Sequence, residues 1–261
     1  MSIRTTAILN LKGGVAKTTT VINMAAILAR DHKARVLVID ADSQCNTTEF
    51  FGAEADGTTI SHILRDAPCY ESPEAAAVLA IQGTAQRNVY IIPADDTLMD
   101  LDLTAVSQGT ASTNVLRYMV EALDQRYDYI LIDCPPAFNA ASAAALVAAD
   151  DVLIPIKLDA FSLRGMANLM RQIKNMRKIN PRLKVAGILP TMWYNSPKIV
   201  AAEKQLREAG LRLFSHIRRS DKVDDMTFEQ EPLLVCSPNS AAGVDYRRFV
   251  REYVGGAGNV L

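Results

Sequence analysis

One short segment near the start of the chain combines glycine, lysine and threonine in an order suited to phosphate binding. It reads Lys12-Gly13-Gly14-Val15-Ala16-Lys17-Thr18-Thr19. An apolar run over residues 7–11 precedes it, and a helix-patterned run over residues 21–28 follows it. Glycine lacks a Cβ, so a glycine-rich turn can wrap an anion closely and aim backbone N–H groups at it, beside the positive end of a helix. The segment therefore predicts a phosphate-binding loop between a strand and a helix.

Two side chains of this loop add chemistry that backbone N–H groups cannot supply. Lys17 offers a mobile point charge for the outer phosphates of a nucleotide, and the Thr18 hydroxyl is suited to binding Mg²⁺. A glycine turn that merely joins a strand to a helix is the alternative, but it would not need two lysines and two threonines at these spacings. The residues favour a site for nucleotide phosphates and magnesium.

Three aspartates follow apolar, strand-like runs and supply the carboxylates that such a site needs. Asp40 and Asp42 follow the run over residues 35–39, and Asp133 ends the run over residues 129–133. In phosphoryl transfer one carboxylate can hold Mg²⁺ through its water shell while another orients the attacking water. Aspartates at strand ends also cap the helices that follow, and this is the alternative interpretation.

These residues need a scaffold that brings strand ends together, and the rest of the sequence predicts one. Apolar, β-branched runs recur over residues 5–11, 35–39, 89–93, 129–133, 152–156, 185–189 and 213–217. Helix-patterned stretches separate them, including 162–179, with Ser162 as its N-cap, and 240–254. Continuous apolar strands that alternate with helices indicate an α/β fold of three layers, a mainly parallel twisted sheet with helices on both faces. Ligands of such sheets bind at the carboxyl ends of the strands, where these motifs fall.

The bulk composition narrows the class of protein further. The 261 residues are long enough for one large domain, and no linker-like stretch divides them. The apolar fraction is 49%, the mean hydropathy is +0.06, and no apolar run approaches the roughly 18 residues that span a bilayer. With no signal peptide, the sequence predicts a cytoplasmic protein. The four cysteines, Cys45, Cys69, Cys134 and Cys236, form no Cys-x-x-Cys pair and indicate neither a zinc site nor a redox motif.

Positive charge is concentrated in one part of a chain whose formal net charge is only −1. Residues 160–202 contain eight lysines and arginines and no aspartate or glutamate, which leaves a net charge of −9 on the rest. A cationic face on an anionic body is typical of a phosphate-backbone binder, although a solvated helix face is the alternative. Few aromatic residues are interleaved, so the pattern favours non-specific duplex binding over base reading. We assign the DNA contact to Arg171, Lys174, Lys178, Lys198, Arg219 and Lys222.

The phosphate loop, with a lysine ahead of the glycine pair and Lys-Thr-Thr after it, resembles the deviant Walker A motif of the ParA/MinD family of ATPases. Leu11 and Ala16 stand where the usual phosphate-loop pattern has glycine. Residues 40–46 resemble the family's Walker A′ motif, with Ser43 and Cys45 in place of its proline and glycine. Residues 129–136 resemble its Walker B strand. Similarity in the C-terminal third, including 217–222, extends the resemblance over nearly the whole chain and favours a ParA/Soj-type partition ATPase.

The resemblance implies a Mg²⁺-dependent ATPase that binds ATP and ADP and is slow unless a partner stimulates it. Residues 12–19 would hold the nucleotide. The implied site residues are catalytic Lys12, Lys17 and Asp42, magnesium-side Thr18, Asp40 and Asp133, and base-side Met192 and Arg218. In these roles Asp42 would position the attacking water, and Lys12 would reach the nucleotide of a second subunit. Asp40 and Asp133 would act on Mg²⁺ through water.

The resemblance also implies partners and a place of action. ATP would close two subunits into a homodimer that binds double-stranded DNA non-specifically, and a ParB-like protein would stimulate hydrolysis and release. The protein would then be associated with the nucleoid and would drive partition of a plasmid or chromosome. No extension precedes the first strand, so we expect one ParA-like domain over residues 1–261 without the helix-turn-helix region of longer plasmid forms.

Three other interpretations share parts of this pattern. A MinD-like ATPase that cycles on membranes needs a lipid-binding C-terminal helix, which the glycine-rich residues 255–261 do not predict. An iron–sulfur carrier of the nitrogenase iron protein type needs cysteines that bridge two subunits, and these four do not match that arrangement. An ATPase that positions a protein cargo is not separable by sequence from a partition ATPase, because a partner recognises the cargo.

Overall fold

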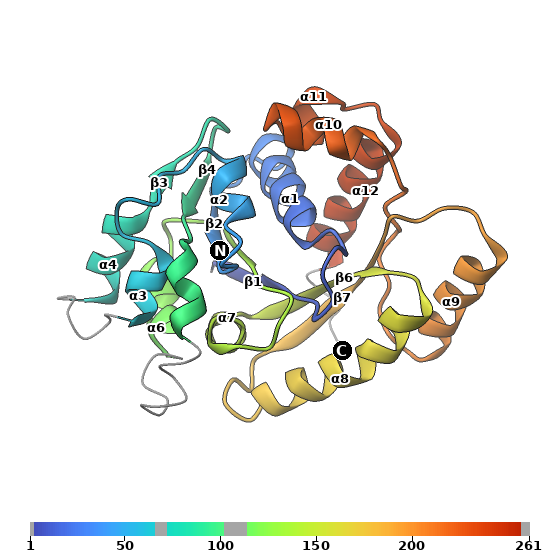
Figure 1. Ribbon diagram of the computed structural model, residues 1–261, viewed down its shortest axis with the longest axis horizontal. Helices are drawn as coiled ribbons and strands as arrows, with labels where there is room; N and C mark the ends of the chain where they lie inside the picture. The colour runs from blue at the N-terminus through green and yellow to red at the C-terminus, as the bar shows by residue number, and fades with distance from the viewer. Residues whose placement is uncertain (1–2, 66–71, 102–113, 257–261) are drawn as a thin grey trace.

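The computed structural model describes residues 3–65, 72–101 and 114–256, and its centre is a seven-stranded sheet (Figure 1). The strands are β1 (Arg4–Ile8), β2 (Val36–Asp40), β3 (Gln82–Gly83), β4 (Val89–Ile92), β5 (Tyr129–Asp133), β6 (Asp151–Lys157) and β7 (Lys184–Thr191). Their order across the sheet is β3-β4-β2-β5-β1-β6-β7, and every neighbouring pair is parallel except β3 with β4. The carboxyl ends of the parallel strands therefore meet at one edge of the sheet.

Helices cover both faces of this sheet (Figure 1). They are α1 (Lys17–Asp31), α2 (Asn46–Phe50), α3 (Ile60–Arg65), α4 (Pro73–Ala80), the 3₁₀ helix η2 (Asp96–Met99), α6 (Val115–Ala122), α7 (Ala140–Ala148), α8 (Ala160–Met176), α9 (Pro197–Glu208), α10 (Lys222–Glu229), α11 (Leu233–Cys236) and α12 (Ala241–Gly255). One buried apolar cluster joins α3, α4, α6, α7 and α8 to one face of the sheet, and a second joins α1, α10, α11 and α12 to the other.

Alternate strand residues supply these two clusters, as the pleat of a strand requires. Ala7 and Ile39 belong to the first cluster, whereas their neighbours Ile8 and Val38 belong to the second. The central strands are therefore buried on both faces, which explains why their sequences are continuously apolar. The predicted three-layer α/β fold with a mainly parallel sheet is confirmed.

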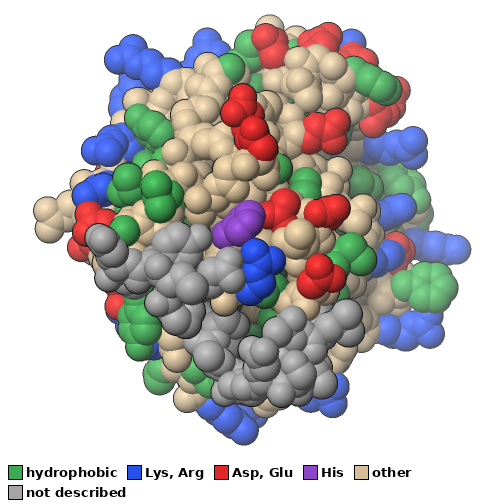
Figure 2. Space-filling view, turned by 60° about the vertical axis from the view of Figure 1, so that its left-hand side comes forward, with side chains coloured by type: hydrophobic (Ala, Val, Ile, Leu, Met, Phe, Trp, Pro, Cys, Tyr) green, Lys and Arg blue, Asp and Glu red, His purple; other side chains and the backbone are tan. Residues whose placement is uncertain are grey.

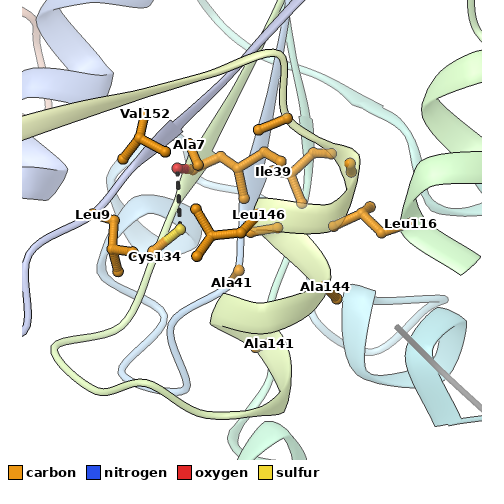
Figure 3. Close-up of a cluster of buried hydrophobic side chains, with 14 of the residues drawn as sticks. Ala7, Leu9, Ile39, Ala41, Leu116, Cys134, Ala141, Ala144, Leu146 and Val152 are labelled. Carbon is orange, nitrogen blue, oxygen red and sulfur yellow. Dashed lines mark hydrogen bonds between the residues drawn. The ribbon is translucent and has the colours of Figure 1, made fainter. Parts of the chain in front are cut away.

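Small side chains let α7 pack closely on the sheet beside the strand ends that carry the aspartates. Figure 3 shows Leu146 of α7 beside Cys134, which directly follows β5, while Ala141 and Ala144 of the same helix lie farther from the cysteine. The Cys134 side chain is fully buried, and its thiol donates to the carbonyl oxygen of Ile132 at 3.7 Å. Cys134 thus acts as a small core residue. Cys45 and Cys236 are half-buried free thiols, and Cys69 lies outside the described residues.

Three details differ from the sequence prediction. Helix α8 begins at Ala160, because Asp159 rather than Ser162 is its N-cap and accepts from the N–H groups of Phe161 and Ser162. Residues 213–217 form no strand, because they contact β7 through an isolated bridge at Leu213 and a separate backbone hydrogen bond from the N–H of Ile217 to the carbonyl oxygen of Pro190. The short antiparallel β3 is absent from the prediction, because two residues carry no periodic pattern.

Two further helices begin directly after polar residues that cap them. Helix α12 follows its N-cap, Ser240, whose hydroxyl accepts from the N–H of Gly243. Helix α7 follows Asn139, which caps it by accepting from the N–H of Ser142.

Among the described helices, none combines the length and the apolar character that crossing a membrane requires.

Candidate functional site

The loop between β1 and α1 presents the unpaired N-terminal end of a helix. Helix α1 begins at Lys17, and its N-cap, Ala16, makes no side-chain capping hydrogen bond. The first N–H groups of such a helix need an outside acceptor, and the helix dipole favours an anion there. Gly14 and Ala16 both have positive φ, 67° and 63°. Alanine in this left-handed region costs roughly 1–2 kcal/mol, which is why phosphate loops usually have glycine at the Ala16 position.

Hydrogen bonds from two neighbouring strands fix the shape of this loop. The Asn10 side chain donates to the carbonyl oxygen of Pro155 at 2.7 Å and accepts from the N–H of Lys12 at 3.0 Å. The Thr191 hydroxyl donates to the carbonyl oxygen of Val15 at 3.1 Å. Lys17 is only 7% exposed, and its Nζ lies 3.5 Å from the carbonyl oxygen of Lys12. The loop is therefore held between the ends of β6 and β7, with the Lys17 ammonium folded over it.

Asp133, at the end of β5, lies against the start of α1. Its Oδ2 accepts from the hydroxyls of Thr18 at 2.7 Å and Thr47 at 2.6 Å. The other carboxylate oxygen, Oδ1, is buried and has no partner within the described part of the chain. Because a buried carboxylate oxygen without a donor is costly, this atom indicates that a cation or an ordered water belongs here. Thr47 is absent from the sequence prediction, since threonines in a short helix are too common to stand out.

Asp40, at the end of β2, pairs in register with Asp133 across neighbouring strands. Its Oδ2 accepts from the N–H and hydroxyl of Thr48 at 2.8 and 2.7 Å, and its Oδ1 accepts from the N–H of Asp42 at 3.1 Å. Burial is the main cause that raises the pKa of Asp40, and the charge of Asp133 is the second. The hydrogen bonds from Thr48 and Asp42 act to lower the pKa, but they do not cancel the rise. Burial likewise raises the pKa of Asp133. Two buried carboxylates side by side form a site that calls for added positive charge.

The donor set at this point fits magnesium. Hard oxygen ligands from carboxylates and a hydroxyl suit Mg²⁺, which keeps several waters and takes its remaining ligands from phosphates. Asp40, Asp133 and Thr18 supply such oxygens beside a free helix N-terminus. No group of three or more His, Cys, Asp or Glu side chains is placed to hold a metal ion within residues 3–65, 72–101 and 114–256. The oxygens of Asp40, Asp133 and Thr18 suit a cation that the protein holds mainly through water and nucleotide.

Asp42 lies two residues beyond Asp40 and is 9% exposed. Its Oδ1 accepts from the N–H of Gln44 at 3.1 Å, which fixes the orientation of the carboxylate at the mouth of the site. The turn continues through Cys45, whose φ of 53° is left-handed. Glycine occupies this position in the motif that the segment resembles, and the left-handed backbone gives the physical reason. The cysteine thus adopts the conformation for which glycine is favoured.

Replacing Asp133 by asparagine is expected to stabilise the nucleotide-free protein. The amide nitrogen can take the place of the unpartnered Oδ1, the oxygen can keep both threonine hydrogen bonds, and one buried charge is lost. We expect a gain of about 1–2 kcal/mol, or roughly 2–8 °C in Tm, measured by thermal unfolding at pH 8. Because the raised pKa values make ionisation destabilising, the gain should shrink as pH falls toward 5.

The same variant should bind nucleotide more weakly when magnesium is present, which calorimetry would measure. The matched control is Asp128→Asn, a change at an exposed position just before β5. A loss of stability in Asp133→Asn at pH 8 would contradict the interpretation that the two buried carboxylates repel each other.

The Lys12 side chain is held within its own chain. Its Nζ lies 2.6 Å from Oδ2 of Asp159 and 3.1 Å from the hydroxyl of Ser162, both at the start of α8. Although burial acts to raise the pKa of Asp159, hydrogen bonds from Lys12 and Ser162 outweigh it and lower the pKa to about 2. To contact another subunit, the Lys12 ammonium would first have to leave its ion pair with Asp159. Asp159 is absent from the sequence prediction, which assigned the cap of this helix to Ser162.

Two substitutions of Asp159 separate its ion pair from its helix cap. Asp159→Asn keeps the Oδ1 that accepts from the N–H groups of Phe161 and Ser162 but removes the charge facing Lys12. For a pair that is about one-third exposed, we expect a loss of at most about 1 kcal/mol. Asp159→Ala also removes the cap and should cost about 1 kcal/mol more. Urea unfolding at pH 7 measures both, and equal losses in the two variants would contradict this division. The stabilisation that the ion pair contributes should be lost as pH falls from 4 to 2. Over that range Asp159 becomes protonated, because its pKa in the folded protein is lowered to about 2.

A cleft of about 640 Å³ adjoins the loop on the β7 side. Ala16 and Thr19 line it together with Met192 and Arg218, the two base-side residues of the sequence prediction. The Arg218 guanidinium is held by the fully buried Asp245, which accepts from its Nε at 2.7 Å and its Nη2 at 2.9 Å. The cleft has a suitable size for a nucleoside, and Asp245 positions one of its walls.

The six residues assigned to DNA contact lie on three parts of the structure. Arg171 and Lys174 are exposed on α8, Lys178 is exposed in the turn that follows α8, and Lys198 is exposed at the start of α9. Arg219 is exposed and borders the 640 Å³ cleft. Lys222 forms an ion pair with Asp225, with 2.7 Å between Nζ and Oδ2, so part of its charge is already neutralised. Figure 2 shows one face of the protein. Acidic side chains lie near the centre of this face, and most lysines and arginines lie toward its edges.

Similarity to known proteins agrees with this site. A model of the AAA domain family matches residues 3–185. The chromosome partitioning protein ParA of Caulobacter vibrioides is 34% identical over 260 residues, which cover 97% of this chain and 94% of that protein. The chromosome-partitioning ATPase Soj of Thermus thermophilus is 33% identical over 255 residues, which cover 96% of this chain and 95% of that protein.

Among solved structures, a cobyrinic acid a,c-diamide synthase from Mycobacterium smegmatis with bound ADP and magnesium superposes with a TM-score of 0.82. It is 25% identical and covers 99% of this chain and 98% of that one. Nucleotide and magnesium are thus bound by a protein of the same fold. With a sequence match above 30% over almost its full length, the chain belongs to the ParA/Soj family of chromosome-partitioning P-loop ATPases.

Proposed function

We propose that this protein is a magnesium-dependent ATPase that dimerises on ATP, binds duplex DNA without sequence preference and drives partition of a plasmid or chromosome. One observation carries the proposal. Thr18, at the start of α1, lies 2.7 Å from the buried Asp133, with the Lys17 ammonium folded over the same loop. A hydroxyl, an unpaired carboxylate oxygen and a lysine around a free helix N-terminus are the parts that phosphoryl transfer requires.

In this mechanism the protein binds, orients and stabilises charge. N–H groups of the loop and the Lys17 ammonium bind the phosphates. Thr18 would hold Mg²⁺ directly and Asp40 and Asp133 would hold it through water, and the ion would supply positive charge that neutralises the phosphates. Asp42, fixed by the N–H of Gln44, orients the attacking water. Because burial raises the pKa of Asp40 and Asp133, the protein alone resists holding two negative charges there, and a bound cation would relieve that repulsion.

Lys12 links hydrolysis to dimerisation. In the single chain its ammonium is bound by Asp159 and Ser162. On dimerisation it exchanges this ion pair for the triphosphate of the second subunit, where it stabilises charge that develops during transfer. The exchange is favourable only when a nucleotide of sufficient charge is present, so ATP and not ADP closes the dimer.

DNA binding is assigned to lysines and arginines that have few partners of their own. Lys174, Lys178 and Lys198 are exposed and form no ion pair with the described residues. Dimerisation doubles the number of such cations on one particle, so phosphate contacts and counterion release both increase. Hydrolysis separates the subunits and releases DNA, and a ParB-like partner at the cargo stimulates that step. The nucleoid is then the surface on which the protein cycles.

The deciding experiment measures binding to a duplex of about 40 bp against salt, in ADP and in a slowly hydrolysed ATP analogue. We expect tight binding only with the analogue, with log Kd rising linearly with log salt and no preference between duplex sequences. In the double variant Lys174→Ala, Lys178→Ala, the slope of log Kd against log salt should fall by about 1 for each phosphate that the variant no longer neutralises. Equal binding in both nucleotides would contradict the proposal. Anionic vesicles serve as the second arm, and ATP-dependent vesicle binding stronger than DNA binding would favour a MinD-like function.

A further inference from the structure

A second cleft, of about 510 Å³, lies at the far end of α1 from the phosphate loop. It is bounded by the last turn of α1, the turn that leads into β4 and the helix α11. Lys17 and Arg30 are 13 residues apart on α1, which corresponds to about 20 Å along the helix. The cleft is therefore separate from the phosphate loop, and none of the residues assigned to DNA lines it.

Three cations line this cleft, and no aspartate or glutamate is among its lining residues. Arg30 lies in the last turn of α1 and donates from Nη1 to the carbonyl oxygen of Leu234 at 3.3 Å. Lys33 donates from Nζ to the carbonyl oxygen of Arg30 at 2.8 Å. Arg87 is exposed and has no hydrogen bond or ion pair with the described residues. Asp31 is next to Arg30 in sequence but pairs with Arg247, with 3.4 Å between Oδ2 and Nε. The positive charge of the cleft is thus not balanced locally.

The floor of the cleft is apolar. Ala26 and Ala29 of α1, Val89 of β4 and Leu234 of α11 line it, and each is at most 4% exposed. Val235 adds an apolar side chain at the rim that is 40% exposed. A recessed apolar floor below three cations is complementary to a chain that carries both an apolar side chain and carboxylates.

We propose that this cleft binds an acidic segment of a partner protein. One apolar side chain of the segment packs on the apolar floor described above, and its carboxylates contact Arg30, Lys33 and Arg87. Duplex DNA fits less well, because its phosphates contact protruding cations and gain nothing from a recessed apolar floor. Free phosphate would leave the floor uncovered. Arg30 and Lys33 lie at and just beyond the end of α1 and Arg87 lies in the turn before β4, so the cations can contact carboxylates spaced along an extended or helical segment.

The test uses a random dodecamer peptide library displayed on phage and selected on the nucleotide-free wild-type protein. A variant with Arg30→Glu, Lys33→Glu and Arg87→Glu serves for counter-selection. We expect enriched peptides to combine aspartate or glutamate with leucine, isoleucine or phenylalanine. Binding of one enriched synthetic peptide, followed by fluorescence anisotropy, should weaken roughly tenfold or more in Arg87→Glu and with rising salt. Arg87 makes no described hydrogen bond, so this single variant tests the cleft without disturbing the contact between α1 and α11.

The matched control carries the same change of charge on the other cationic surface, Lys174→Glu with Lys178→Glu and Lys198→Glu, and should bind the peptide as the wild type does. Failure to enrich acidic peptides, or unaltered binding in Arg87→Glu, would overturn the proposal. Displacement of the peptide by millimolar inorganic phosphate would also overturn it, because the site would then take a simple anion. Loss of duplex DNA binding in Arg87→Glu would overturn it in favour of DNA as the occupant of the cleft. None of these outcomes depends on ATP hydrolysis, so they do not decide the proposed ATPase cycle.

Discussion

Asp42→Ala is expected to bind ATP, dimerise and hold DNA while hydrolysing ATP about 10²–10⁴ times more slowly than the wild type. The Asp42 side chain accepts one hydrogen bond, from the N–H of Gln44, and the Asp42 N–H supports Asp40 through the backbone. Alanine keeps that backbone bond and removes only the carboxylate that would orient water. Nucleotide affinity should therefore change little, whereas turnover should fall.

Single-turnover hydrolysis with magnesium measures this effect, and DNA retention after dilution measures its consequence. Asp42→Asn keeps the shape of the side chain and tests whether its charge is needed. Glu49→Ala, which removes an exposed carboxylate from the neighbouring α2, is the matched control and should hydrolyse ATP normally. Wild-type turnover in Asp42→Ala would show that the water is oriented by another group.

Lys12→Ala is expected to abolish the ATP-bound dimer and to leave nucleotide binding by the single chain in place. The Lys12 ammonium lies near Asp159 and Ser162, so it makes no contact in the single chain that would hold the phosphates of its own nucleotide. Its loss removes a charge that only the second subunit's triphosphate would use. Light scattering with a slowly hydrolysed ATP analogue should show a dimer for the wild type and a monomer for the variant.

Two further variants give the Lys12 experiment its controls. Lys17→Ala should lose nucleotide binding itself, because Lys17 is buried against the phosphate loop. Lys204→Ala removes a lysine whose side chain is 75% exposed on α9 and should dimerise normally. A normal ATP-bound dimer in Lys12→Ala would refute the cross-subunit role of Lys12 and leave the ATPase assignment intact.

The sequence by itself determined the fold class and the order of the motifs along the chain. Strands buried on both faces must be continuously apolar, so β2 and β5 were visible as runs of valine, isoleucine and leucine. The phosphate loop was visible because few other structures need glycines, lysines and threonines in that order. Both signals are local, so they can be recognised in the sequence without knowing which residues pack against them.

Only the tertiary structure decided which distant residues share a site. Thr47 reaches Asp133 across 86 positions, Asp159 reaches Lys12 across 147, and Asp245 holds Arg218 across 27. The cationic cleft forms only because α11 packs across the end of α1, which brings Leu234 under Arg30. Aspartates and threonines are common and serve many purposes, so spacing along the chain does not reveal these pairs. They are fixed by the order of strands in the sheet and by the packing of helices on it.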